Sequence, residues 1–150
     1  MAIDHSTIVA LDEARRSLDD AIATHKQFIA HVGTQGKSDS RINATLYGEG
    51  DKLAVTAFGQ TVTANARHVQ RSAGSFVTEY VFYAANGNFD EEVFRCYLSP
   101  LGRLFERPED TTPFAQSFSD GIVAEHICGT VAFALLTADV LNPTPPKSDI

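Results

Sequence analysis

Two long segments with a helical pattern of apolar residues enclose six short runs in which apolar and polar residues alternate. In the first long segment, Ser6–Val32, apolar side chains recur at spacings of three, four and seven residues, which places them along one stripe of a helix. The second, Asp120–Leu141, has a wider apolar stripe and several small residues that allow close approach to another helix or to a sheet. The stripe of the first helix consists of Ile8, Leu11, Leu18, Ile22, Ile29 and Val32.

The six alternating runs are typical of β-strands, and the short turns between them determine how the strands pair. Two-residue turns at positions 49–50 and 59–60 select the same inner face, since the first sets Leu46 opposite Leu53 and the second sets Val55 opposite Ala64. The first three strands therefore form a meander with a single apolar side.

The last three runs continue this meander through a longer loop, Ala85–Glu91, and a turn at Ser99–Gly102. The loop sets Phe82 opposite Phe94, and the turn would set Cys96 opposite Phe105. We therefore predict an α+β fold, a six-stranded antiparallel meander with the N-terminal and C-terminal helices packed on one face.

The length of 150 residues suits one domain with one core. We assign residues 1–141 to a single α+β domain and expect residues 142–150, which contain three prolines, to form a mobile C-terminal tail.

The charge of the chain argues against several classes of partner. Nineteen acidic and twelve basic residues give a net charge of −7 without a long basic run, so neither nucleic acid nor a membrane surface is an expected partner. The N-terminus lacks the pattern of a signal peptide, and the two cysteines cannot form a disulfide framework. These features favour a cytoplasmic protein.

Familiar catalytic motifs are missing from the sequence. It contains no phosphate-binding glycine loop, no GxSxG elbow, no HExxH and no paired zinc cysteines. We expect no metal and no cofactor, and we regard an enzyme as less probable than a binding protein.

The outer face of the last three strands is unusually apolar for a face that two helices leave uncovered. Arg95 would lie opposite Glu106 and diagonal to Glu79, so that these charges neutralise one another. Such a surface is typical of protein binding or homodimerisation, unless the loop Pro108–Phe118 folds across it. The predicted protein-binding patch consists of Val81, Tyr83, Val93, Arg95, Tyr97 and Leu104.

The leading hypothesis is a non-catalytic protein-binding module, such as an adaptor, inhibitor, immunity protein or chaperone, that acts through this face as a homodimer. The alternative is a small-molecule-binding domain or a small cofactor-independent enzyme with a pocket between the first helix and the sheet. That pocket would be lined by His25, His68, Phe82 and Phe94. The whole assignment requires both helices to cover the same face of the sheet.

Overall fold

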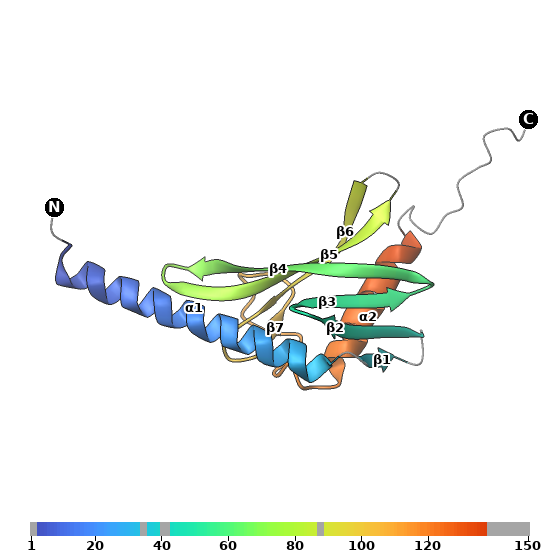
Figure 1. Cartoon of the computed structure of the whole chain (residues 1–150), viewed down its shortest axis with the longest axis horizontal. Coiled ribbons are helices and arrows are strands. Elements are labelled where there is room, and N and C mark those ends of the chain that lie inside the picture. Colours follow the sequence, from blue (N-terminus) through green and yellow to red (C-terminus); the bar gives the residue numbers. More distant parts are fainter. Residues whose placement is uncertain (1–2, 34–35, 40–42, 87–88, 138–150) are drawn as a thin grey trace, which may run out of the picture.

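The computed structural model describes residues 3–33, 36–39, 43–86 and 89–137. Its strands form one antiparallel sheet in sequence order, flanked by an N-terminal and a C-terminal helix (Figure 1). The predicted α+β meander is confirmed, and a short seventh strand, β1, is added at its edge. The tail expected at residues 142–150 lies outside the described residues. The elements are α1 (His5–Val32), β1 (Lys37–Asp39), β2 (Ala44–Glu49), β3 (Lys52–Ala57), β4 (Gln60–Ser72), β5 (Ser75–Asn86), β6 (Phe89–Leu98), β7 (Leu104–Phe105) and α2 (Ile122–Thr137).

Both helices contribute to one hydrophobic core on the inner face of the sheet. α1 crosses β2, β4 and β5, and α2 lies over β1, β2, β3 and β6. Phe28 of α1 is fully buried and meets the ring of Tyr80 edge to face, with 5.7 Å between the ring centroids. Each large apolar side chain buried here contributes roughly 1.5–3 kcal/mol. The residues supplied by α2 are Val123, Ile127, Cys128, Val131, Ala132 and Leu135.

The first two turns lie one residue away from their predicted positions. Leu46 pairs with Val55, and Val55 pairs with Val62. Gly50 takes a positive φ at the first position of its turn, which moves the turn one residue along the chain. Because both pairings shift by two residues, the side chains keep their orientation and the predicted inner face is unchanged.

The third pairing is as predicted, with Phe82 opposite Phe94, but the last one is shifted by a single residue. Tyr97 pairs with Phe105, and Leu98 pairs with Leu104, so Leu104 points into the core and Phe105 points outward. The reason is that the chain reverses through a three-residue loop, closed by a hydrogen bond of 2.8 Å from the Ser99 amide to the Arg103 carbonyl.

The first turns of α1 extend past the end of the sheet (Figure 1). Asp4 caps the helix, since its carboxylate accepts a hydrogen bond of 2.8 Å from the Thr7 amide. Only the second half of the predicted apolar stripe packs against the sheet. Ile8 and Leu11 are exposed, and the buried positions begin at Ala21. The sequence pattern correctly predicted the helix but not the length of it that the sheet covers.

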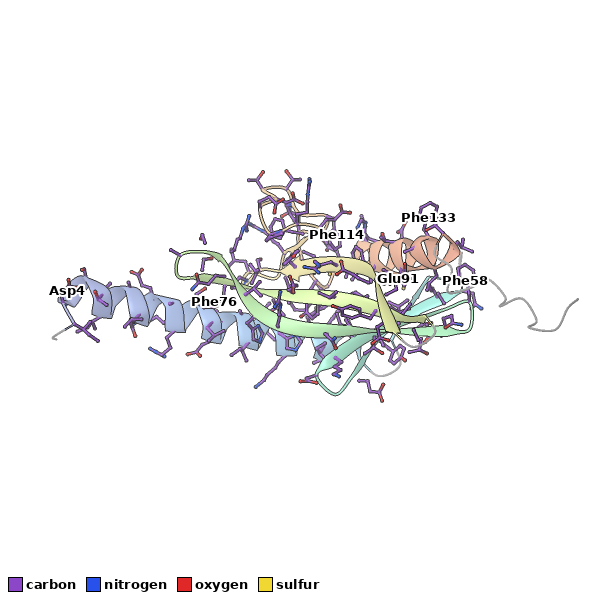
Figure 2. The ribbon with its side chains drawn as sticks, turned by 90° about the horizontal axis from the view of Figure 1, so that it is seen from above. Asp4, Phe58, Phe76, Glu91, Phe114 and Phe133 are labelled. Carbon is purple, nitrogen blue, oxygen red and sulfur yellow. The ribbon has the colours of Figure 1, made fainter. Side chains whose placement is uncertain are left out.

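The turn between β3 and β4 carries a backbone strain that can be tested. Phe58 has φ +52° and precedes Gly59 at φ +73°, the combination of a type I′ turn, in which Asn or Gly is strongly preferred at the first position. Figure 2 shows Phe58 at this end of the sheet, where about half of its side chain is exposed.

We expect Phe58→Asn to stabilise the protein by roughly 1 kcal/mol, measured by urea unfolding, because Asn tolerates the left-handed conformation. Phe58→Ala is the matched control, since it removes the ring but keeps the strain. A gain for Ala equal to that for Asn would contradict the explanation.

Candidate functional site

The outer face of the sheet is less open than predicted. Val81 and Tyr97 are buried, and Tyr83 is half-buried. Leu104 was assigned wrongly, because the shifted pairing of β7 places it in the inner core. Val93 has no cross-strand partner at a β-bulge and packs against the main core. The predicted patch is therefore not a continuous apolar surface.

Part of the outer face is covered from within the chain. Val77, Tyr97 and Phe105 form a second, smaller hydrophobic cluster. The guanidinium of Arg71 lies 5.0 Å from the centroid of the Phe105 ring and also donates a hydrogen bond to the carbonyl of Asp110. Arg71 therefore covers the Phe105 ring at this end of the outer face and ties it to the loop at Asp110.

The aromatic residues of the loop that was expected to cover the outer face pack elsewhere. Phe114 and Phe118 contact the main core, and Phe114 stacks on His126 with 4.1 Å between the ring centroids. Most of the loop's apolar surface thus serves the inner face.

The centre of the outer face holds a buried carboxylate. Glu79 is only 4% exposed. Its Oε1 accepts a hydrogen bond of 2.6 Å from Arg67 Nε, and its Oε2 accepts one of 3.2 Å from Arg95 Nη1 and one of 3.0 Å from the Tyr97 hydroxyl. Arg95 thus neutralises Glu79 as expected. Glu106, which was expected opposite Arg95, instead places its Oε1 2.9 Å from His126 Nε2.

Burial alone would raise the pKa of Glu79, because a charged carboxylate loses its hydration in the sheet. Hydrogen bonds from Arg67 and Tyr97, together with the charges of Arg67 and Arg95, outweigh this effect and hold its pKa below the ordinary value. Glu79 is therefore ionised at neutral pH, and its partners are held in place by it.

A recess of about 290 Å³ opens above this carboxylate. Val81 and Tyr83 form its apolar wall, and Arg67, whose side chain is 71% exposed, stands at its rim. The complete lining is Asn65, Ala66, Arg67, Glu79, Val81, Tyr83 and Arg95. Three of the six residues of the predicted patch, Val81, Tyr83 and Arg95, belong to this recess.

The inner face brings together the two histidines of the alternative hypothesis. The rings of His25 and His68 lie edge to face with 5.8 Å between their centroids. His25 Nδ1 is 2.6 Å from the hydroxyl of Tyr80, and His68 Nδ1 is 2.9 Å from the hydroxyl of Thr78. The sequence analysis did not predict Tyr80 and Thr78 as partners of the histidines, because inward-facing residues of a strand indicate only core packing.

Phe82 and Phe94 belong to a different group of rings. Their centroids are 5.8 Å apart, and Phe94 continues to His126 of α2 rather than to the histidine pair. The recess beside α1, about 380 Å³ in volume, is lined by other residues. Its apolar walls are Phe28, Val32, Leu46, Phe118 and Val123, with Ala124, His31, Gly36, Ser119, Asp120 and Gly121 completing the lining.

Burial lowers the pKa of both histidines. The neighbouring His68 and Lys26 lower the pKa of His25 further, whereas a backbone hydrogen bond and the carboxylate of Asp51 oppose the shift. Both imidazoles are therefore neutral at pH 7, and protonating both would place two positive charges in contact.

Other chemistry finds little support in the described ranges. Among these residues no group of three His, Cys, Asp or Glu side chains is placed to hold a metal ion. Cys96 and Cys128 are buried, and burial raises the pKa of the Cys96 thiol, which disfavours a reactive thiolate. No helix within the described part of the chain has the length and apolar character to cross a membrane.

The histidine pair predicts acid sensitivity. Because the folded pKa of His25 lies below its ordinary value of 6.5, the unfolded chain binds more protons, so stability should fall as the pH drops below about 6.5. We expect His25→Gln to reduce the number of protons taken up on unfolding, so that stability falls less steeply with acid, measured by urea unfolding between about pH 7.5 and pH 5. His5→Gln, at the exposed start of α1, is the control. An unchanged pH dependence in His25→Gln would contradict the assignment.

Comparisons with known proteins do not add a function. No protein-family model matches the chain, and neither a curated protein nor a solved structure is significantly similar to it.

Proposed function

We propose that the protein is a non-catalytic binding module that holds another protein at the recess above Glu79. The observation that carries this proposal is the buried carboxylate held by two guanidiniums and a phenol under a recess walled by Val81 and Tyr83. Arginine and tyrosine are among the residues most enriched at the energetic centres of protein interfaces. The network fixes the positions of Arg67 and Arg95 before a partner arrives, which lowers the entropic cost of binding.

The charges of the recess favour an uncharged occupant. Arg67 and Arg95 carry two positive charges, and Glu79 carries one negative charge. Glu92 lies outside the lining but pairs with Arg95, which brings the sum of the four charges to zero. A volume of about 290 Å³ admits one or two side chains. An aromatic side chain fits best, since it can lie on Val81 between the ring of Tyr83 and the guanidinium of Arg67.

The proposal includes a cytoplasmic location. It is supported by the two buried thiols, Cys96 and Cys128, which are typical of reducing compartments.

Peptides selected from a random library displayed on phage can test the proposal. We expect the selected peptides to carry an aromatic anchor, to shift the backbone amide resonances of Val81 and Tyr83, and to bind Tyr83→Ser about tenfold or more weakly. Tyr47→Ser is the matched control, because Tyr47 is a partly buried tyrosine on the outer side of β2. Peptides that map to another face, or that lose equal affinity with both variants, would refute the proposal.

A second candidate is a small-molecule-binding function in the recess beside α1. The observation that favours it is the recess of about 380 Å³, whose walls include the core residues Phe28, Leu46 and Val123. Apolar walls with a few polar groups are typical of ligand sites of this size. Native mass spectrometry of the protein from its own host should then show a retained small molecule that is lost in Ala124→Trp. A spectrum without any adduct in the wild-type protein would argue against this function.

A further inference from the structure

α2 is apolar on the side that faces the solvent as well as on the side that faces the sheet. Its buried side supplies the core, yet Ile122 is 49%, Phe133 is 68% and Leu136 is 60% exposed. Figure 2 shows Phe133 pointing away from the sheet. A helix that is apolar all round is normally buried on all sides, so the exposed side of α2 lacks a cover among the described residues.

The exposed apolar residues lie along one straight stripe of the helix, with a glycine in its middle. Ile122, Gly129 and Leu136 follow one another at intervals of seven, and Phe133 lies one turn beyond Gly129. A Cβ atom added to Gly129 would meet nothing within 4 Å. Large side chains at both ends and a glycine in the middle allow another helix to approach closely.

We infer that α2 pairs antiparallel with α2 of a second copy of the chain, across a twofold axis that passes near Gly129. A twofold axis brings the same stripe of both copies together, so one apolar surface is covered by its own equivalent. Ile122 of each copy then lies beside Leu136 of the other. The pattern of two large ends and a small centre matches its own equivalent in either direction, so the direction of the pair is decided by charge.

The charge of α2 selects the antiparallel direction. Glu125 is the only acidic residue in the helix. In the antiparallel pair the two Glu125 side chains are displaced by eight residues, or about 12 Å along the axis, which exceeds the screening length in physiological salt. A parallel pair would place them side by side.

The other exposed apolar helix surface, at the start of α1, is a weaker candidate for this contact. Ile8 and Leu11 share one side of the helix, but Val9 points elsewhere. The ion pairs of Arg15 and Arg16 with Asp12 lie along the same turns and would have to be desolvated in an interface. The four residues of the stripe on α2, Ile122, Gly129, Phe133 and Leu136, are themselves uncharged, and the pair of His126 with Glu106, 2.9 Å apart, lies beside them.

The small area of the stripe predicts a weak dimer in equilibrium with the monomer. A standard interface removes about 800 Å² from each partner. α2 is about 24 Å long and about 10 Å across, so the pair covers only part of that area and belongs to the weak, transient class. The stripe and the Glu79 recess face opposite sides of the sheet, and the dimer therefore leaves the recess open.

Sedimentation equilibrium of the full chain tests the inference. We expect a monomer–dimer equilibrium in the micromolar range, and Leu136→Asp should weaken it about tenfold or more. Leu11→Asp is the matched control, since Leu11 is 59% exposed on a helix and should leave the equilibrium unchanged. A dimer that survives Leu136→Asp, or that is lost in Leu11→Asp, would overturn the inference.

Two further variants separate the contact from folding and show its direction. Gly129→Leu should raise the melting temperature of the monomer, because leucine favours a helix, and should weaken the dimer by keeping the helices apart. Ile122→Cys should form disulfides with Leu136→Cys in a mixture of the two proteins but not with itself. Self-crosslinking of Ile122→Cys would indicate a parallel pair and contradict the proposed axis.

A monomer at all concentrations would also overturn the inference.

Discussion

The period of two in a β-strand is the constraint on which the rest of this structure depends. Every inward side chain of the meander must meet a helix, and every outward side chain must meet water or another surface. Phe28 of α1 and Ile127 of α2 are both fully buried against the same face, so that face contains the core. The pairings of β2 with β3 and of β3 with β4 differ by two residues from the predicted ones, and the same side chains still face inward because a shift of two keeps the parity. The single-residue shift at β7 exchanged the roles of Leu104 and Phe105.

The outer face depends on a different interaction, the burial of Glu79. A carboxylate that is removed from water must be matched by donors, and Arg67, Arg95 and Tyr97 supply them from three positions on neighbouring strands. This requirement keeps polar side chains on a face that would otherwise close as a second core. It also holds two sides of the recess in place, since Arg67 and Arg95 are both bonded to the same carboxylate.

The two proposed contacts use opposite sides of the molecule and therefore need not compete. A dimer through α2 would present two Glu79 recesses directed away from the axis. A partner with two anchor residues could then bind with a higher effective affinity than one recess supplies, provided that its linker spans the distance between them. Neither contact needs the histidine pair, whose position between α1 and the sheet links it to stability rather than to a surface.

The sequence by itself determined the order of the main elements, the antiparallel meander and its apolar face, because these follow from local periodicity and turn chemistry. That both helices cover this face was decided only by the tertiary structure, since their packing depends on distant segments. It also placed Val81, Tyr83 and Arg95 on the outer face, because their alternation with inward residues is a local property. Only the tertiary structure decided that His25 meets His68 and that Arg67 joins Glu79, because such contacts depend on how distant segments cross. The exposure of Leu136 was likewise beyond the sequence, since an apolar residue in a helix looks the same whether or not a neighbour covers it.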